Sequence, residues 1–413
     1  MLDGREGPAV AMAMRIVVAL ARLRDARRLR PVASAHLDGC LHHGQAGLDF
    51  VERLVDLGGR VRIPTTLNVG SLDLLHPNLA RVSKSEATES RKLMDAYVAL
   101  DAHPTWTCAP YQVGHRPSLG EHVAWAESNA IVFCNSVLGA RTDRYGDFLD
   151  ASAAITGLVP DSGLHLSENR RATLIVDCSG LSDELKSSSV LYPVLGYLAG
   201  RVAGTEVPVF TGLADARPDE DKLKALGATA ASAGGVALFH IAGVTPEAPT
   251  LAVALGGRSP HEVPTVVVDA DAVRTARNSL TTALGDGIDA VSLGTPHFSL
   301  NEFRSLAELT IDGDAFDPST EVWVSTSRAV LAQARDAGYL DPIEQAGATI
   351  LTDTCTYVTP VLKPGTRVVM TNSGKWAYYA PGNIGVDVVF ASLAECVASA
   401  RVGRVVHDDR IWR

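Results

Sequence analysis

A helical pattern followed by a short apolar strand recurs along this chain, and that repetition constrains the fold more than any other feature. Residues 9–29 have helical apolar spacing and lead to a predicted strand at 31–36. Residues 47–59 repeat the arrangement, with a glycine-ended helix before a predicted strand at 60–64. Repeated helix-then-strand units predict an α/β fold.

The second half of the chain shows the same pattern. A helical segment at 221–227 precedes a predicted strand at 236–241, and short apolar strands are expected at 265–269, 290–294 and 322–325. Such continuous apolar runs indicate parallel strands that are covered on both faces. Ligands of open α/β sheets bind beyond the carboxyl ends of the strands, so one crevice fed by several loops is expected. Polar groups follow the predicted strands at His240, 295–297, 325–327 and 353–355.

The length of 413 residues exceeds that of one hydrophobic core, so more than one domain is expected. Weak joints lie near 161–171, where a polar segment ends, and near 247–263, which is rich in proline and glycine. These joints predict an N-terminal α/β domain over 1–170, a middle α/β domain over 171–260 and a C-terminal α/β domain over 261–413.

Composition narrows the class of protein. With 46% hydrophobic and 20% charged residues, the chain suits a large enzyme better than a disordered segment, and its net charge of -10 argues against a nucleic-acid partner. The charged amino terminus lacks a signal-like pattern, and no apolar run approaches the roughly 18 residues that span a membrane. Six scattered cysteines favour reduced thiols or ligands over disulfides, so a cytoplasmic protein is expected.

Residues 126–146 place polar groups in an otherwise apolar helical run. Glu127, Asn135 and Ser136 would be costly to bury without partners, about 1–3 kcal/mol each, so a polar pocket wall is one explanation. The other is that they bond neighbouring loops and helix ends. Arg141 and Arg144 add guanidinium groups that suit a carboxylate or phosphate.

The cysteines fall into two groups. Cys40, Cys108 and Cys355 lie in predicted polar loops, which invites interpretation as exposed ligands, and no Cys-x-x-Cys supports a zinc ribbon. They come from distant parts of the chain, as ligands of an iron–sulfur cluster can, although spacing alone leaves this open. The other three lie in apolar patterns typical of small core residues: Cys134, Cys178 and Cys396.

Lys375 stands alone among small and aromatic residues after a predicted strand and a glycine. It could hold a carboxylate at a helix start, or it could pack its stem on Trp376 or Tyr378 while the amine reaches water. A Walker loop, a nucleophile elbow and a dinucleotide fingerprint are missing, which removes the common α/β enzymes.

A set of motifs in this chain resembles the aconitase X family, part of the aconitase superfamily. They include Ala-His-Leu-Asp-Gly at 35–39, Gly-Thr-Pro-His at 294–297 and Asn-Ser-Gly-Lys-Trp at 372–376. The resemblance covers almost the whole chain, and its other motifs lie at 63–69, 107–112, 120–130, 135–142 and 353–355. It implies an aconitase-like arrangement of parallel or mixed sheets flanked by helices, with the active site in a crevice between domains.

The resemblance also implies an activity. Characterised aconitase X proteins are iron–sulfur-dependent dehydratases, of which one branch acts on cis-3-hydroxy-L-proline, giving a pyrroline carboxylate, and the other on mevalonate 5-phosphate. The motifs at 294–297 and 374–376 resemble the hydroxyproline branch, because the phosphomevalonate branch typically has a cysteine where this chain has Thr295. We therefore expect a hydro-lyase for a small hydroxy imino acid, with phosphomevalonate dehydratase as the alternative. A non-catalytic binding or scaffold subunit is a further alternative of another class.

The same resemblance implies a cofactor and a site. Cys108 and Cys355 are the implied ligands and Cys40 the third, for a [2Fe-2S] cluster or alternatively a [3Fe-4S] or [4Fe-4S] cluster. An iron open to the substrate would act as a Lewis acid that eases loss of hydroxide. Lys375, Arg141 and Ser373 are the candidate catalytic residues. The candidate substrate-binding residues are Asn68, Glu127, Asn135, Ser136 and His297.

The family pattern further implies a partner. Hydroxyproline dehydratases usually carry an additional small swivelling domain, and this chain is expected to contain only the large part. A separately encoded small subunit is therefore expected, and the family's small domain supplies a serine regarded as the base.

Overall fold

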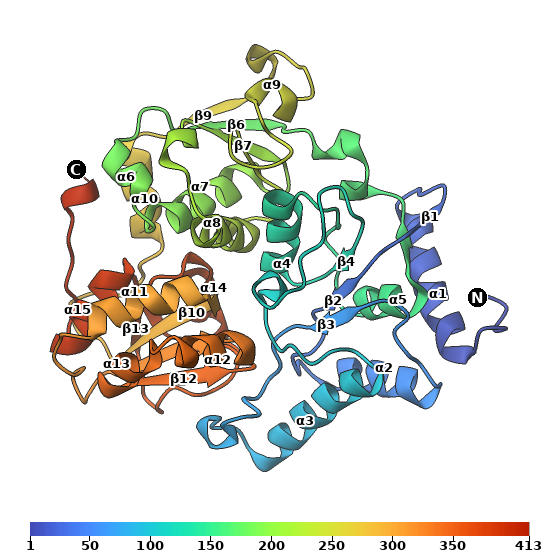
Figure 1. Ribbon diagram of the computed structural model, residues 1–413, viewed down its shortest axis with the longest axis horizontal. Helices are drawn as coiled ribbons and strands as arrows, with labels where there is room; N and C mark the ends of the chain where they lie inside the picture. Colours follow the sequence, from blue (N-terminus) through green and yellow to red (C-terminus); the bar gives the residue numbers. More distant parts are fainter. Residues whose placement is uncertain (413) are drawn as a thin grey trace.

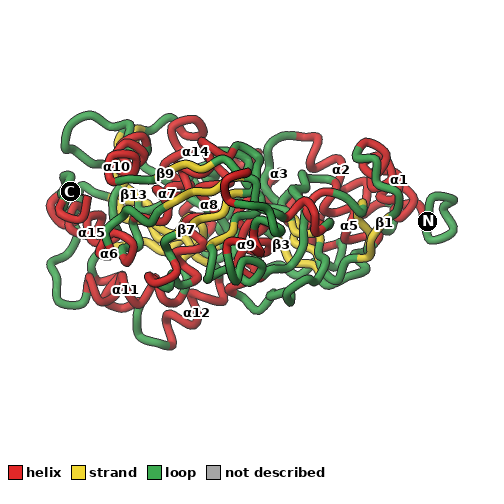
Figure 2. The backbone as a smooth tube through the Cα atoms, turned by 90° about the horizontal axis from the view of Figure 1, so that it is seen from above, coloured by secondary structure: helices red, strands yellow, loops and turns green. Residues whose placement is uncertain are grey.

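Three parallel sheets follow one another along the chain in the computed structural model, which describes residues 1–412 (Figure 1). In the view of Figure 1 the first sheet lies on the right, the second at the top and the third at the lower left. Turned by 90°, the molecule is flat and elongated, with the N-terminus at one end and the C-terminus at the other (Figure 2).

The first sheet has the order β3-β2-β4, and all its strands run parallel. A separate antiparallel pair, β1 with β5, lies beside it and packs on α1. The elements of this unit are α1 (Pro8–Leu23), β1 (Leu29–Pro31), β2 (Ala35–Leu37), α2 (Gln45–Asp56), β3 (Thr65–Leu67), α3 (Lys84–Ala99), β4 (Ala124–Trp125), α4 (Ser128–Phe133), the π-helical turn η3 (Cys134–Leu138), α5 (Leu149–Thr156) and β5 (Leu158–Pro160).

The second sheet has the order β8-β7-β6-β9 and is also parallel. Helices α7 and α8 pack closely because α7 carries glycines at the contact: a Cβ on Gly196 would lie 2.3 Å from the carbonyl oxygen of Leu226. The elements are β6 (Leu174–Asp177), α6 (Asp183–Ser187), α7 (Leu191–Ala203), β7 (Pro208–Thr211), α8 (Glu220–Ala233), β8 (His240–Ile241), α9 (Leu251–Ala254), β9 (Thr265–Val267) and α10 (Ala270–Ser279).

The third sheet is parallel, with the order β12-β11-β10-β13-β14. Its helix α14 packs on α8 and α7, which joins this unit to the second. The elements are β10 (Ala290–Phe298), α11 (Leu300–Thr310), β11 (Glu321–Thr326), α12 (Arg328–Asp336), α13 (Leu340–Gln345), β12 (Ala348–Thr352), β13 (Val368–Thr371), α14 (Gly374–Ile384), β14 (Asp387–Phe390) and α15 (Leu393–Val402).

Short 3-10 turns connect these elements. The first and third units each have an apolar core, and the core of the second unit also includes residues of the third, among them Trp376 and Phe390. The turns are η1 (Pro77–Leu79), η2 (Pro110–Gln112), η4 (Gly163–His165), η5 (Ser167–Arg170), η6 (Ala214–Ala216), η7 (Pro260–Glu262) and η8 (Arg410–Trp412). Among residues 1–412, no helix combines the length and the apolar character needed to cross a membrane.

The predicted α/β class with parallel sheets flanked by helices is confirmed, but several local predictions were wrong. The helix expected over 9–29 ends at Leu23, close to Asp25, whose φ of 51° leaves the helical region. The strand expected over 31–36 is two strands, β1 and β2, and the strand expected over 60–64 begins only at Thr65. Pro64 has no N–H for a sheet ladder, so the pairing starts after it.

Two further predictions differ from the structure in the residue ranges they gave. The strand expected over 236–241 is limited to His240–Ile241. Strand β9 pairs with β6, and α10 packs on α7, so both belong with the second sheet although they lie after residue 260. The boundary expected near 260 therefore falls inside the unit that the second sheet organises.

Candidate active site

The carboxyl ends of the first sheet bring three polar residues to one edge. Asp38 follows β2, Asn68 follows β3, and Glu127 comes two residues after β4. Because these strands are parallel, their ends meet at the same edge of the sheet. All three side chains line one cavity of about 340 Å³.

The third sheet contributes the opposite wall of that cavity. Thr295 belongs to β10, Cys355 follows β12, and Lys375 lies in the first turn of α14, directly after β13. Cys108 reaches the same cavity from the loop before η2. The site is therefore built between the first and third units.

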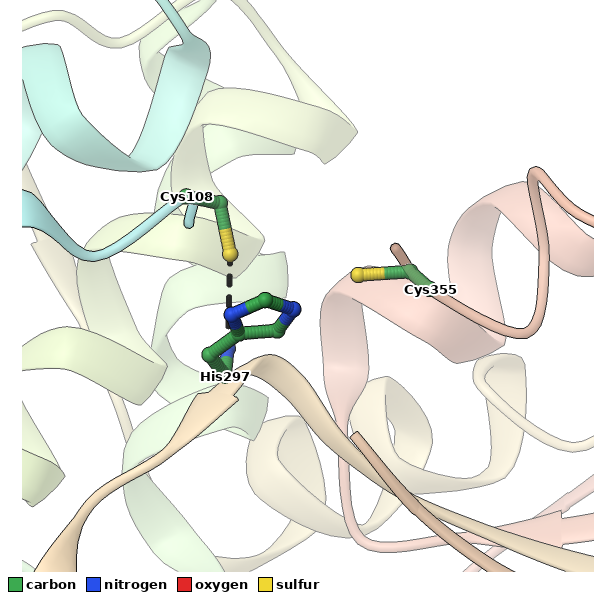
Figure 3. A group of neighbouring side chains, drawn as sticks. All are labelled: Cys108, His297 and Cys355. Atoms are coloured by element: carbon green, nitrogen blue, oxygen red, sulfur yellow. Dashed lines mark hydrogen bonds between the residues drawn. The ribbon is translucent and has the colours of Figure 1, made fainter. Parts of the chain in front are cut away.

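Cys108 and Cys355 lie together although 247 positions separate them in the chain. Their sulfur atoms and a ring nitrogen of His297 all lie within 4.8 Å of one another. Figure 3 shows the three side chains turned toward one another. The neighbouring Cys355 thiol lowers the pKa of Cys108 through a hydrogen bond, against the effect of burial. The same contact, together with burial, raises the pKa of Cys355.

His297 supports Cys108 through its backbone, whose N–H donates a hydrogen bond to the Sγ at 3.3 Å (Figure 3). Its ring is already satisfied by the protein: Nε2 lies 3.1 Å from the carbonyl oxygen of Thr354, and Nδ1 lies 3.0 Å from Oγ1 of Thr107. A carbonyl only accepts, so Nε2 carries the proton and the Thr107 hydroxyl donates to Nδ1. Both nitrogens are thus used, and His297 is a positioning residue for the two cysteines.

The donor set at this point fits an iron–sulfur cluster. Two buried sulfurs face each other, and a backbone N–H already donates to one of them, an arrangement that stabilises cluster ligands. The hydroxyl of Thr295 is buried in the same wall and has no hydrogen-bond partner among residues 1–412. Cys40 lies elsewhere: it is fully buried in the apolar core of the first unit, outside the Cys108–His297–Cys355 group.

The expectation that the loop cysteines are exposed was wrong. All six cysteines are buried, including Cys40, Cys108 and Cys355. The loops that carry Cys108 and Cys355 are covered because the first and third units close over them.

Lys375 forms a buried ion pair with Glu127. The Nζ lies 2.5 Å from Oε1 of Glu127 and 3.3 Å from the hydroxyl of Ser128. Burial opposes the charge on the amine, but Glu127, Tyr357 and Cys108 together outweigh it, and the pKa of Lys375 is raised well above its usual value. The remaining oxygen of Glu127 accepts the N–H of Ala130 at 2.7 Å and caps α4. The site thus holds a permanently charged lysine.

Asp38 lies in an acidic environment at the edge of the same cavity. Burial, followed by the charges of Glu127, Asp147 and Asp150, raises the pKa of Asp38 to about 8. The pKa of Asp150 rises to about 7, mainly through burial and then through the charge of Asp147. Asn68 donates from Nδ2 to Oδ1 of Asp38 at 2.5 Å. Negative charge at this end is therefore unfavourable unless a cation enters.

Asn135 and Ser136 are placed in the framework and not in the cavity. The amide of Asn135 accepts from the N–H of Thr142 and from Arg170, and it donates to the carbonyl oxygens of Thr142 and Ala237. The hydroxyl of Ser136 accepts the N–H of Phe239 at 2.9 Å. These contacts correspond to the framework alternative considered for the polar helical run.

Arg141 and Ser373 also lie outside the cavity around the cysteines. Arg141 donates to the carbonyl oxygen of His165 and to the hydroxyl of Ser167, and so holds the segment between the first and second units. The hydroxyl of Ser373 accepts the N–H of Trp376 at 3.0 Å and donates to the carbonyl oxygen of Thr295. Arg144, by contrast, does line the cavity, and within the described part of the chain its guanidinium donates a single long hydrogen bond, 3.4 Å to the carbonyl oxygen of Ala231.

A second cavity of about 550 Å³ lies on the far side of Thr295, at the carboxyl ends of β10, β13 and β14, and Ser373 lines it. Its buried cation, Lys224, is already paired with Asp221 at 3.1 Å and with Glu302. The smaller cavity holds the cysteines and the lysine and is the better candidate for chemistry.

The sequence interpretation missed Asp38, Tyr379 and Asn383 as cavity residues. Asp38 could have been found, because it directly follows a predicted strand in the motif at 35–39. Tyr379 and Asn383 offered no such signal: they lie on α14, and only the packing of that helix decides which of its residues face the cavity.

Comparison with protein families covers most of the chain. Residues 1–168 match the aconitase X first domain, residues 172–278 the second domain and residues 288–402 the third domain.

Two kinds of curated relative resemble the chain. It is 44% identical over 406 residues to cis-3-hydroxy-L-proline dehydratase of Pseudomonas aeruginosa, covering 98% of this chain and 69% of the relative. The protein of that name from Hypocrea jecorina is 42% identical over 402 residues, 97% of this chain and 67% of the relative. The phosphomevalonate dehydratase large subunit of Methanothermobacter thermautotrophicus is 41% identical over 393 residues, 94% of each chain.

A solved structure has the same fold. The crystal structure of Thermococcus kodakaraensis aconitase X in its holo-form superimposes with a TM-score of 0.85 at 34% identity, covering 97% of both chains.

Proposed function

The chain belongs to the aconitase X family, and we propose that it is a hydro-lyase that converts cis-3-hydroxy-L-proline to Δ1-pyrroline-2-carboxylate. The observation that carries this proposal is the meeting of Cys108, Cys355 and the Lys375–Glu127 pair at one small cavity. Two relatives named for this activity match at 44% and 42% identity over nearly the whole chain. The residues and the relatives thus point to the same dehydration.

The cofactor that fits the site is an iron–sulfur cluster, which we propose to be of the [2Fe-2S] type. Cys108 and Cys355 would hold it, and the backbone N–H of His297 supports the first of these sulfurs. When bound, the cluster supplies a Lewis acid for the departing hydroxyl group. Cys108 and Cys355 would supply two of the four external ligand positions of such a cluster.

The residues of this chain bind the substrate and stabilise its charge. Loss of the proton beside the carboxylate develops enolate-like negative charge, and the buried ammonium of Lys375 lies where it can offset that charge. Arg144 is suited to the substrate carboxylate, because its guanidinium has most of its donors free at the cavity wall. Glu127 keeps Lys375 charged and in place.

We further propose that the chain works with a small subunit. Two relatives named as large subunits, from Methanothermobacter thermautotrophicus and Thermococcus kodakarensis, match this chain over 94% and 92% of their own length. Those names imply a partner, which on family grounds would supply the catalytic base. The six free thiols suit the reducing environment of a cytoplasm.

Phosphomevalonate dehydration is the second candidate function. It is favoured by the 41% identity to a large subunit that this chain matches along 94% of both sequences. Thr295 at the cavity wall, without a third cysteine beside Cys108 and Cys355, favours the hydroxyproline reaction.

The experiment that tests the proposal is anaerobic purification with the candidate small subunit, followed by iron and sulfide quantitation. Dehydration is then assayed on cis-3-hydroxy-L-proline and on mevalonate 5-phosphate. The proposal is supported if cis-3-hydroxy-L-proline is dehydrated by the wild type and by Cys396→Ala but not by Cys355→Ala. Cys396 is the control because it lies in the apolar core of the third unit. Turnover of mevalonate 5-phosphate alone would replace it with the second candidate. Protein that never binds iron would favour a non-catalytic subunit.

A further inference from the structure

Asn68 and Asp38 line the cavity as a hydrogen-bonded pair. Asn68 is 1% exposed, and its Nδ2 donates to Oδ1 of Asp38 at 2.5 Å. Its backbone N–H is also used, by the carbonyl oxygen of Leu37 at 2.9 Å. The amide orientation follows from this contact, because a flipped amide would place two acceptors against each other. One of the two N–H groups on Nδ2 of Asn68 is therefore committed to Asp38.

The oxygen of that amide needs a donor from outside the protein. Oδ1 of Asn68 is buried and has no hydrogen-bond partner among residues 1–412. A buried acceptor without a partner is unfavourable, so a ligand that brings an N–H or O–H to this point would gain from it. Asn68 and Asp38 line the cavity together, so a single donor group can meet both.

The charges around the cavity select the kind of donor. Asp38 is surrounded by the charges of Glu127, Asp147 and Asp150, which favour a cation and oppose an anion. The ammonium of Lys375 is already paired with the carboxylate of Glu127. A phosphate at this end would meet carboxylates and an amide oxygen, and both would disfavour it.

We propose that Asn68 Oδ1 and the Asp38 carboxylate bind the ring ammonium of the substrate and thereby select an imino acid over hydroxy acids without an amine. This inference rests on the proposed function and adds which groups recognise the substrate. A secondary ammonium carries two N–H donors and a positive charge, which match two acceptors of which one is ionisable. The carboxylate of the same substrate then extends toward Arg144.

The test compares two ligands that differ only at the ring atom. L-Proline carries the ammonium, and (S)-tetrahydrofuran-2-carboxylate has an ether oxygen in its place. Their inhibition constants are measured against cis-3-hydroxy-L-proline turnover with the anaerobically prepared holoenzyme. We expect the wild type to prefer L-proline by about tenfold or more, as a charge-assisted contact provides.

The informative variants are Asp38→Asn and Asn68→Ala. Asp38→Asn keeps an oxygen that can accept from Asn68 and removes the charge, so the preference for L-proline should fall by about tenfold while the ether ligand binds as before. Asn383→Ala, an asparagine on α14 that lines the same cavity, is the matched control and should leave the preference unchanged.

Each result has one meaning. A preference that stays the same in both Asp38→Asn and Asn68→Ala, or equal losses for the two ligands, would overturn the ammonium assignment while turnover of hydroxyproline keeps the proposed function. Dehydration of mevalonate 5-phosphate alone by the wild type would overturn both.

Discussion

Lys375 of the third unit and Glu127 of the first form an ion pair that is buried on both sides, with side chains 5% and 6% exposed. The backbone of Glu127 has a φ of 68°, which lies in the left-handed region and costs a residue other than glycine about 1–3 kcal/mol. The pair thus joins two units at the cavity, and a strained backbone positions one of its members.

Removing only one member of this pair should be strongly destabilising. Lys375→Met leaves the Glu127 carboxylate buried without its partner, and we expect a loss of about 3–5 kcal/mol in the free energy of unfolding together with loss of turnover. The double variant Glu127→Gln with Lys375→Met should recover much of the stability and none of the activity. Urea unfolding and the dehydration assay measure the two effects. Equal stability of the single and double variants would contradict the pairing.

Cys40 is expected to be dispensable for the cluster. It is packed in the first core, where its thiol lies 3.8 Å from the carbonyl oxygen of Leu37, so Cys40→Ala should cost about 1 kcal/mol of stability and leave iron content unchanged. Cys108→Ala, measured in the same way, should lose the iron. Iron lost equally from both variants would make Cys40 the third ligand.

Asp73 should control the placement of Cys355. Its carboxylate is fully buried and accepts the N–H and the hydroxyl of Thr352, at the end of β12, and the N–H groups of Leu75 and His76. We expect Asp73→Ala to lower the free energy of unfolding by about 3 kcal/mol and to reduce iron loading, because hydrogen bonds to a charged group are lost across two units. Asp95→Ala, which removes an exposed ion pair with Arg91, is the control and should change neither quantity measurably.

His165 should make the protein less stable in mild acid. Burial, and then the positive charges around it, lower the pKa of His165 to about 3 from an ordinary 6.5. Below pH 6.5 the unfolded chain therefore binds a proton at His165 that the folded chain does not bind. The contribution of His165 to the free energy of unfolding is fully present above pH 6.5 and is lost as the pH falls toward 3. Between pH 7 and pH 5 this residue accounts for about 2 kcal/mol.

The measurement is the urea midpoint at both pH values for the wild type and for His165→Gln. The variant should show a smaller loss on acidification, although its stability at pH 7 falls because the 2.5 Å contact with the Tyr145 hydroxyl is removed. His261→Gln, at an exposed position, is the control. The same loss of stability in all three proteins would contradict the assignment to His165.

Asn135 should act on stability and not on substrate binding. Asn135→Ala removes hydrogen bonds to Thr142, Arg170 and Ala237, and we expect a loss of about 3 kcal/mol with an unchanged KM for the remaining folded enzyme. Asn68→Ala should show the opposite balance, with KM changed more than stability. A raised KM in Asn135→Ala would return this residue to the substrate site.

Some of the site could be predicted from local pattern. Cys108, Cys355 and Lys375 stood out because each is a reactive residue in a short polar or small-residue segment, and the structure brings all three to one cavity. Asn135, Ser136 and Arg141 stood out for the same reason, yet their partners are other parts of the framework. A buried polar side chain has the same appearance in sequence whether a ligand or the protein satisfies it.

The sequence by itself determined the α/β class, the parallel strands and the polar residues that follow them, because these depend on hydrophobic periodicity and on turn residues a few positions apart. Tertiary packing alone brings Cys355 to Cys108 while Cys40 stays in the first core, pairs Lys375 with Glu127, and leaves Oδ1 of Asn68 without a partner among residues 1–412. These contacts join residues up to 248 positions apart, and they arise from how the carboxyl edges of the first and third sheets face each other, which no local pattern encodes.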